Sequence, residues 1–284
     1  NNYKLFLDQL HDSIEKYFLP DCTKDYFVWT DVNNFNFKHT VKSIKIEPQG
    51  FPGDTLFRYH YFLMAEDILK DYDYIFYLDA DMCIVDYVGD EIITDRLGVQ
   101  HPGFYKENNK HGTPETRSIS TAYVDPQQIV QYCCGGFNGG SSEEFLKLSQ
   151  TIVDNINKDM QKDIIAIWHD ESHLNKYFVD NPPSRILDCG YCAPESAWDV
   201  PFPKKILALD KSVDTLCIIK RTRSPYWYVQ CYVNKNYSKS GYHFESTKIK
   251  EKRSAWARAK DIHRQFDPAK YEIPINTIKD NFNT

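Results

Sequence analysis

Two aspartates separated by one residue follow an apolar run in the segment Tyr74–Met82. The run Tyr74–Leu78 has the composition of a β-strand buried on both faces of a parallel sheet. In open α/β sheets, side chains that do chemistry collect at the carboxyl ends of such strands. Asp79 and Asp81 therefore predict a site for one divalent cation, Mn²⁺ or Mg²⁺, that in turn holds phosphate oxygens. An acidic turn without a ligand is the alternative interpretation of these two residues alone.

A glycine-rich segment could bring the backbone close to a ligand. Four glycines lie within Gly135–Gly140, so the chain there must approach another group closely or adopt positive φ angles. Such a backbone could approach a sugar, and a tight turn before a helix is the alternative. Ser141 and Glu144 have the spacing of a capping box for the helix that follows.

Three basic residues late in the chain, Lys220, Arg221 and Arg223, could cap phosphates that a cation holds. A solvated basic turn is the alternative, because charge clusters are usually surface features. The two aspartates could also belong to a phosphatase with an aspartate nucleophile. That class has the pattern D-x-D-x-T, and this chain has Cys83 in place of the threonine, which disfavours a phosphatase.

His169 and His173 have the i, i+4 spacing that places two histidines on one face of a helix. A zinc hydrolase of the zincin type needs glutamate directly after the first histidine, where it acts as the base. Asp170 occupies that position and Glu171 follows it. The sequence therefore does not fit a zincin.

The elements around these residues alternate between strand and helix, which is the signature of an α/β fold. Apolar residues at helical spacing predict helices, and alternating or continuous apolar runs predict strands. The predicted helices are residues 3–18, 55–69 and the segment after Ser141, and the predicted strands are residues 25–31, 41–46 and 74–78. The polar residues 105–118 predict a mobile surface loop.

Length and composition limit the class of protein. The 284 residues are 42% hydrophobic and 15% aromatic, enough for a sizeable core in one large or two smaller domains. A net charge of −6 argues against a nucleic-acid partner. No stretch has the ~20 apolar residues of a transmembrane segment. The eight cysteines include one C-x-x-C pair but no second pair at zinc-ligand spacing, which predicts mostly free buried thiols.

Several short segments together resemble family 6 of the glycosyltransferases, the group that includes the histo-blood-group A and B transferases. They occur in the family's order over roughly residues 3 to 223, and the ten-residue block Trp168–Tyr177 is the most specific. The matching segments are Phe27–Asp31, Leu78–Met82, Val88–Ile92, His101–Tyr105, Gly135–Ser141, Trp168–Tyr177, and Pro194–Glu195 with Trp198–Asp199.

The resemblance implies a GT-A (Rossmann-like) α/β fold with a central, mostly parallel sheet flanked by helices. It implies retaining transfer of GalNAc or Gal from a UDP-sugar to the 3-hydroxyl of a β-galactoside at the end of a glycan. Glu171 would lie by the anomeric carbon, as the nucleophile or as the charge that stabilises an oxocarbenium-like state. A UDP-sugar-binding protein without turnover is the alternative, and the presence of all expected acidic residues disfavours it.

By position in the matching segments, the remaining site residues divide between metal, donor and acceptor. The metal ligands would be Asp79 and Asp81. The donor-binding residues would be Tyr3, Arg58, Asp79, Asp81, Cys134, Gly135, Gly136 and Asp170, with Lys220 and Arg223 from the basic cluster. The acceptor-binding residues would be His101, Phe104, Trp168 and Asp199.

Donor choice is expected to depend on Cys134, Gly135 and Gly136. In the family, glycine at the third of these positions leaves room for an N-acetyl group, whereas alanine favours galactose. Gly136 therefore predicts UDP-GalNAc over UDP-Gal. Cys134 departs from the leucine, methionine or histidine that is usual in the family.

We expect residues 1–225 to form the catalytic domain and residues 226–284 a C-terminal extension. A structural wrap is the expected role of the extension, and an acceptor-side or partner-binding role is the alternative. The family's first strand, which cradles uracil, is expected to precede this sequence. Tyr3 falls where the family has its uracil-stacking tyrosine.

Overall fold

The computed structural model describes residues 3–31, 40–195 and 199–210, three strands after them, and residues 248, 250, 254 and 258. Side chains are described from residue 6, and those of the strands at 217–245 lie outside the described part. The chain divides into two compact units, Asn1–Leu209 and Asp210–Thr284. The domain boundary expected near residue 225 stays a prediction.

A four-stranded sheet forms the centre of the first unit, with the strand order β3-β6-β5-β7. Its strands are β3 (Tyr74–Leu78), β5 (Arg96–Val99), β6 (Phe137–Ser141) and β7 (Arg185–Leu187). Strand β6 is antiparallel to β3 and β5, whereas β5 and β7 are parallel.

The expectation of a mostly parallel sheet therefore needs correction, because the described sheet is mixed. Strands β3, β5 and β7 run in one direction, but two of the three neighbouring pairs are antiparallel. The described chain between β5 and β6 contains only a short 3₁₀-helix, η2 (Pro126–Gln128). A parallel neighbour is usually reached through a crossover α-helix, and the described residues between β5 and β6 contain none. Strand β6 instead lies antiparallel beside β5.

Strand β3 is half-buried, which corrects the expectation of burial on both faces. Successive side chains of a strand point to opposite faces. Ile75 and Tyr77 pack with one hydrophobic cluster, and Phe76 and Leu78 pack with another. The strand therefore separates two cores, and its next residues, Asp79 onward, emerge between them.

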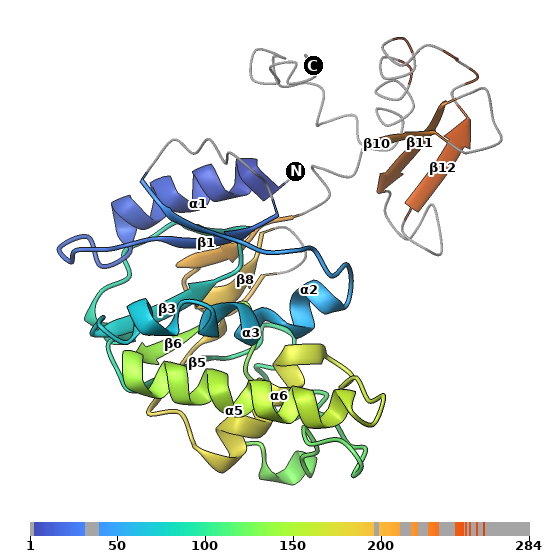
Figure 1. Cartoon of the computed structure of the whole chain (residues 1–284). Helices are drawn as coiled ribbons and strands as arrows, with labels where there is room; N and C mark the ends of the chain where they lie inside the picture. Colours follow the sequence, from blue (N-terminus) through green and yellow to red (C-terminus); the bar gives the residue numbers. More distant parts are fainter. Residues whose placement is uncertain are drawn as a thin grey trace. The chain divides into compact units, whose positions relative to one another are not determined.

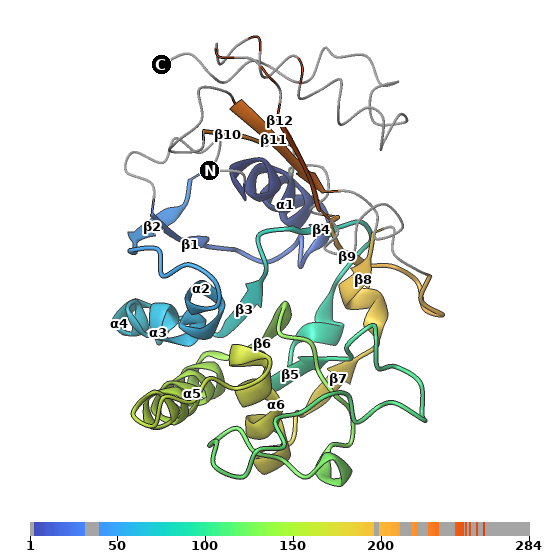
Figure 2. The same ribbon diagram turned by 90° about the vertical axis from the view of Figure 1, so that its right-hand side faces the viewer.

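Helices cover the two faces of this sheet (Figures 1 and 2). One core contains residues of α2 (Gly53–Leu56), α3 (Arg58–Leu63), α5 (Ser142–Met160) and α6 (His169–Asp180). The other contains residues of α1 (Tyr3–Tyr17) and β4 (Met82–Ile84). Of the described helices, none is both long enough and apolar enough to span a membrane.

The helix predicted at 55–69 is divided into three short helices, α2, α3 and α4 (Glu66–Leu69). The backbone leaves helical angles at Phe57 (φ −91°, ψ 12°) and at Ala65 (φ −114°, ψ 13°). Apolar spacing predicted a buried face that included Met64 and Ile68, but these two side chains are 57% and 50% exposed. The spacing also did not indicate the two bends.

Gly139 and Gly140 lie in strand β6, whereas Gly135 and Gly136 lie in the bend that precedes it. A Cβ atom on Gly139 would lie 2.5 Å from the Ile75 carbonyl oxygen, and Gly140 has φ +153°. Both expected reasons for glycine therefore apply. The predicted capping box is wrong, because Ser141 makes no side-chain cap and Glu144 pairs with Arg96 instead, at 2.8 Å.

Smaller β-structures complete the first unit. β1 (Phe27–Thr30) and β2 (Lys42–Lys45) form a parallel pair, as predicted for strands at 25–31 and 41–46. β4, β9 (Ile206–Ala208) and β8 (Ala193–Pro194) form a three-stranded sheet in the order β4-β9-β8. Two further 3₁₀-helices are η1 (Asp90–Ile92) and η3 (Cys189–Cys192).

The second unit contains an antiparallel sheet of β10 (Cys217–Lys220), β11 (Trp227–Tyr232) and β12 (Tyr242–Ser246). Six cysteines of the first unit are free, and five of them are buried, as predicted.

Candidate active site

Arg58 is the centre of a charged cluster at the carboxyl end of β3. Its Nη2 lies 3.2 Å from Asp79 Oδ1, and its Nη1 lies 3.0 Å from Asp170 Oδ2. Nη1 also donates a hydrogen bond to the Gly135 carbonyl oxygen at 3.0 Å. The planar guanidinium offers several donors in fixed directions, which suits such bridging. One side chain thus joins α3, the end of β3, the start of α6 and the chain before β6.

Tyr77 supports this cluster, although the sequence analysis did not single it out. The Arg58 guanidinium lies over its ring, 4.6 Å from the centroid, and its hydroxyl donates to Asp79 Oδ1. The signal was present in the sequence, because residues two apart in a strand point to the same face. Tyr77 therefore had to lie beside any side chain that Asp79 projects from the strand end.

Backbone hydrogen bonds fix both aspartates in the turn after β3. Asp79 N donates to the Gly136 carbonyl at 2.8 Å, and Met82 N donates to the Asp79 carbonyl at 3.0 Å. Leu209 N donates to the Asp81 carbonyl at 2.8 Å. The Asp79 carboxylate is 33% exposed, whereas Asp81 is buried.

The two aspartates provide the donor type that a hard divalent cation prefers. Among the described residues there is no group of three or more His, Cys, Asp or Glu side chains that could hold a metal. A cation held by Asp79 and Asp81 would complete its coordination with phosphate or water oxygens. This fits the usual binding of Mg²⁺, which takes one or two carboxylates together with substrate phosphates.

Glu171 lies in the first turn of α6, against Gly135. Its Oε2 accepts a hydrogen bond from Gly135 N at 2.8 Å. A Cβ atom on Gly135 would lie 3.4 Å from Glu171 Cβ and 3.6 Å from Arg58 Nη1, so the glycine allows both side chains to approach. Burial raises the pKa of Glu171 to about 7, and the hydrogen bond from Gly135 opposes this rise.

Asp170 is buried beside Arg58, and it is the second carboxylic acid of the site with a raised pKa. Burial raises its pKa to about 6, Arg58 opposes the rise and Asp79 adds to it. Perturbed carboxylates that share a site are typical of catalytic centres, although structural ion pairs also produce them. The sequence-predicted residues Arg58, Asp79, Asp170 and Glu171 therefore form one connected site with Gly135.

His101, Phe104 and Tyr132 form a neutral aromatic edge in which each ring contacts the others, and the exposed Trp168 is grouped with them because of the acceptor role predicted for it. The rings of His101 and Phe104 lie 4.8 Å apart, and those of Phe104 and Tyr132 lie 5.4 Å apart. Burial lowers the pKa of His101 to about 4, so its imidazole is neutral at pH 7. Its Nδ1 accepts a hydrogen bond from Gly103 N at 3.0 Å, which leaves the proton on Nε2.

Trp168 directly precedes α6 and is 48% exposed. Its indole Nε1 donates to Thr113 Oγ1 at 2.8 Å. An aromatic side chain with a polar group at its rim can contact both the apolar face and the hydroxyls of a sugar. Sequence analysis did not single out Thr113 or Tyr132, because neither belongs to a segment whose spacing predicts chemistry.

Gly136 and Cys134 differ in their surroundings. A Cβ atom on Gly136 would lie 2.7 Å from Met82 Cε and 3.0 Å from Asp79 Oδ2. Any side chain at position 136 would therefore press on the carboxylate of Asp79, one of the two predicted metal ligands. Cys134 is buried in the core cluster of α1 and β4.

The structure does not join the other predicted residues to this site. Asp199 is 97% exposed and pairs with Lys204 at 3.3 Å. The side chains of Tyr3 and Lys220, and all of Arg223, lie outside the described residues, so their roles stay predictions.

The two histidines at zincin spacing have separate surroundings. His173 is buried, with Nε2 4.0 Å from Asp159 Oδ2, while His169 packs edge-on against Phe51. In the described part of the chain they belong to no three-ligand group.

Comparison with known proteins places these features in a family. Residues 1–215 match the family described as Glycosyltransferase family 6. The O-antigen biosynthesis glycosyltransferase WbnI of Escherichia coli is 34% identical over 197 residues, which are 68% of this chain and 84% of that protein.

Two mammalian proteins are also similar. Histo-blood group ABO system transferase 1 of Rattus norvegicus is 39% identical over 127 residues, 45% of this chain and 35% of that protein. Globoside alpha-1,3-N-acetylgalactosaminyltransferase 1 of Homo sapiens is 26% identical over 230 residues, 75% of this chain and 65% of that protein. The match therefore spans most of the bacterial protein and a smaller part of the mammalian ones.

Proposed function

The chain belongs to glycosyltransferase family 6, and from this premise we propose that it is a retaining α1,3-hexosyltransferase. The donor would be UDP-GalNAc or UDP-Gal, and the acceptor the 3-hydroxyl of a β-galactoside at the end of a glycan. The observation that carries this proposal is the contact network of Arg58, which brings Asp79, Asp170 and the Gly135–Glu171 pair into one site.

The charged cluster fits the donor. Asp79 and Asp81 would hold Mn²⁺, or Mg²⁺ in its place, and the bound cation would neutralise the negative charge that develops on the departing UDP. Arg58 would orient the donor, since its guanidinium already holds two carboxylates and a carbonyl in fixed positions. Asp170, which is fixed by Arg58, would accept hydrogen bonds from the hydroxyls of the hexose.

Glu171 fits the reacting centre. In the reaction the bond between the anomeric carbon and the UDP oxygen breaks, a bond to the acceptor 3-oxygen forms, and the proton of the 3-hydroxyl would pass to the departing diphosphate oxygen. Positive charge develops on the anomeric carbon, and a preorganised carboxylate stabilises it. Retention follows either from a covalent intermediate on Glu171 or from attack on the same face within an ion pair.

The aromatic edge fits the acceptor. His101 and Phe104 offer a neutral stacked pair, and Trp168 provides an exposed face. A neutral surface suits a galactoside, which carries no charge.

Gly136 supports GalNAc as the preferred sugar. The position carries no side chain between Met82 and Asp79 Oδ2, and a methyl group there would occupy space next to the metal-binding aspartate. We therefore propose UDP-GalNAc as the better donor of the two.

The test is a donor screen that measures UDP release. The chain is incubated with UDP-GalNAc or UDP-Gal, with lactose or a fucosylated galactoside, and with Mn²⁺ or a chelator. The proposal predicts acceptor-dependent UDP release that the chelator abolishes, and a product with an α1,3 linkage by NMR. Asp79→Asn should lose metal-dependent release, whereas the exposed Asp86→Asn serves as the matched control. Lack of acceptor-dependent release from either donor, or a β-linked product, would contradict the proposal.

A further inference from the structure

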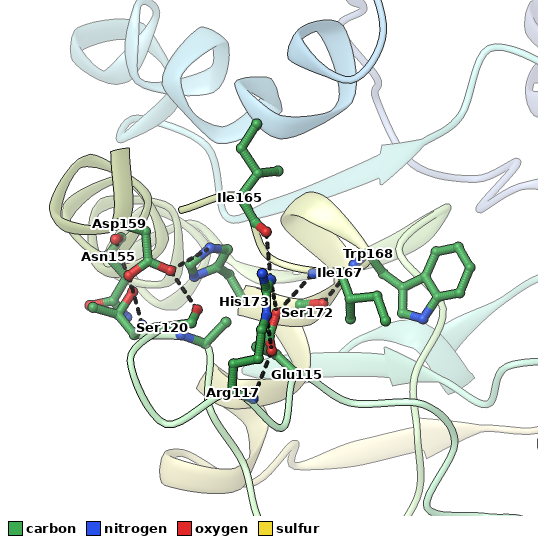
Figure 3. Close-up of polar contacts among 12 residues, drawn as sticks. Glu115, Arg117, Ser120, Asn155, Asp159, Ile165, Ile167, Trp168, Ser172 and His173 are labelled. Carbon is green, nitrogen blue, oxygen red and sulfur yellow. Dashed lines mark hydrogen bonds and ion pairs between the residues drawn. The ribbon is translucent and has the colours of Figure 1, made fainter. Parts of the chain in front are cut away.

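The segment 113–121 docks against the chain that leads into α6 (Figure 3). The sequence predicted a mobile surface loop over residues 105–118. This expectation needs correction in its second half, because Glu115 is only 1% exposed. The polar composition of the segment reflects an internal network of hydrogen bonds and not contact with solvent alone.

Glu115 accepts four hydrogen bonds. Its Oε1 accepts from Arg117 N at 2.8 Å and from Arg117 Nε at 2.9 Å. Its Oε2 accepts from Arg117 Nη2 at 2.5 Å and from Ile167 N at 2.9 Å. Arg117 Nη2 also donates to the Ile165 carbonyl at 2.6 Å. A buried carboxylate with four N–H donors is fully satisfied, and charge-assisted bonds of this kind are the strong ones.

The bond to Ile167 has a structural consequence for Trp168. Ile167 N precedes α6 and therefore has no place in the helical hydrogen-bond ladder. Glu115 supplies its acceptor, and Thr113, two residues earlier in the same segment, accepts from the Trp168 indole at 2.8 Å. Trp168 N in turn donates to Ser172 Oγ at 3.0 Å. The segment thus holds the Trp168 side chain through Thr113 and the preceding residue, Ile167, through Glu115.

A second anchor fixes the other end of the segment to α5. Asp159 Oδ2 accepts from Ser120 Oγ at 2.5 Å, and its Oδ1 accepts from Thr121 N at 2.7 Å. Thr121 Oγ1 donates to the Asn155 carbonyl at 2.9 Å. The segment is therefore fixed at both ends, so Glu115 is held against a rigid support and can set the position of Ile167.

Glu115 makes no contact with the donor side of α6, and the link between the segment and that side passes through Tyr132, which interacts with both Thr113 and Glu171. Asp170 is held by Arg58, and Glu171 by Gly135 N, and Glu115 takes part in neither contact. Removal of the Glu115 carboxylate should consequently displace Trp168 more than it displaces the residues of the charged cluster.

We propose that Glu115 is a positioning residue that holds Ile167 and thereby places Trp168 against the acceptor. This inference rests on the proposed function, in which Trp168 binds the acceptor. Arg117 has a supporting part, because it fixes the Glu115 carboxylate and the Ile165 carbonyl together. The ion pair keeps the pKa of Glu115 at about 2, so its carboxylate is charged in any ordinary assay.

The main test compares Glu115→Gln with Glu107→Gln. Gln at position 115 keeps the size of the side chain but replaces one acceptor oxygen by an NH₂ group among N–H donors. The acceptor KM should rise about tenfold, in line with the loss of one hydrogen bond to a charged group. The rate of transfer should fall by a larger factor than the rate of acceptor-free hydrolysis of the UDP-sugar. Glu107 is on the same stretch, 86% exposed and paired with Lys110, and its Gln variant should behave like the wild type.

A graded pair of variants covers the case in which Glu115→Gln does not fold. Arg117 is 51% exposed, so Arg117→Ala should fold, and it should raise the acceptor KM more than Arg117→Lys does. Equal losses of transfer and hydrolysis with an unchanged acceptor KM would overturn the proposal, as would kinetics identical to those of Glu107→Gln.

Hydrogen exchange separates this proposal from the proposed function. If the wild type shows no transfer with any donor, the proposed function fails. Hydrogen exchange at the Ile167 amide then still tests whether Glu115 holds that residue in place. That amide should exchange faster in Glu115→Gln than in Glu107→Gln, with α6 beyond Ser172 unchanged. Equal exchange in both variants would show that Glu115 does not hold Ile167.

Discussion

Two regions near the start of α6 differ in chemistry. The charged cluster contains Arg58, Asp79 and Asp170, whereas the aromatic edge around Phe104 contains neutral rings. The segment Trp168–Glu171 serves both, since Trp168 belongs to the edge and Asp170 to the cluster. Under the proposed function, the charged cluster would serve the diphosphate that binds and leaves, whereas the flat apolar faces of the edge would bind a neutral sugar acceptor. Within four residues, the segment Trp168–Glu171 would thus contact both the acceptor, through Trp168, and the donor, through Asp170 and Glu171.

The two regions also differ in how they tolerate change. Each charged side chain of the cluster is largely enclosed and forms an ion pair with a specific partner. Removal of one side chain therefore leaves an opposite charge without its ion-pair partner. The aromatic edge contains stacked rings, where a smaller apolar residue leaves a gap but no unpaired charge.

The largest effect is expected for Arg58→Ala. The variant leaves Asp79 and Asp170 without their shared cation, and loss of one partner of a buried ion pair costs about 3–5 kcal/mol. Urea unfolding should show this loss of unfolding free energy, and Arg58→Lys should show a smaller one. A loss below about 1 kcal/mol for Arg58→Ala would mean that the cluster does not depend on the guanidinium.

Glu171→Gln should lower turnover by at least ~10²-fold, because a charge that faces the transition state is lost. UDP affinity should stay unchanged, since Glu171 contacts Gly135 and not the aspartates of the strand end. The exposed Glu143→Gln, on α5, is the control. Turnover near that of the wild type would remove Glu171 from the reacting centre.

The two regions should respond to pH with opposite signs. Burial raises the pKa of Glu171 to about 7, so its contribution to stability is present below pH 4.5 and is lost as pH rises through 7. The pKa of His101 is lowered to about 4, so its contribution grows as pH rises from 4 to 6.5.

Urea unfolding of the ligand-free chain at several pH values measures both. Relative to the wild type, Glu171→Gln should gain stability as pH rises from 4.5 to 7, and His101→Gln should lose it between pH 4 and 6.5, each by roughly 1–3 kcal/mol. The same sign for both variants would contradict the division into a charged and a neutral region.

The smallest change is expected for Gly136→Ala, which should shift donor preference from UDP-GalNAc towards UDP-Gal by roughly tenfold, the effect of about one methyl group. The added Cβ would lie 2.7 Å from Met82 Cε and 3.0 Å from Asp79 Oδ2. Both are side-chain ends that can shift slightly, so folding should be retained. An unchanged ratio of kcat/KM for the two donors would show that position 136 does not select the sugar.

Local patterns predicted the elements that carry the site, but not how those elements meet. The apolar run before Asp79 and the helical spacing around His169 placed β3 and α6 correctly. The mostly parallel sheet and the capping role of Glu144 were predicted wrongly, because both depend on partners distant in the sequence. Pairing of β6 with β5 and of Glu144 with Arg96 follows from packing, which a local pattern does not contain.

The charged cluster shows the same limit. The resemblance to the family pointed to Arg58 and Asp170, but their contact joins residues more than a hundred positions apart in the chain. Glu115 carried no signal at all, since a single glutamate in a polar stretch has the composition of an exposed loop. Its burial follows from donors on Arg117 and Ile167 that only the folded chain brings together.

The most direct measurement of the central claim compares transfer with acceptor-free donor hydrolysis in two variants, one from each region. Arg58→Lys changes the charged cluster, and Trp168→Leu changes the aromatic edge. The account predicts that Arg58→Lys lowers both rates by a similar factor, whereas Trp168→Leu lowers transfer at least about tenfold more than hydrolysis. Equal losses of both rates in Trp168→Leu would contradict the assignment of one region to the donor and the other to the acceptor.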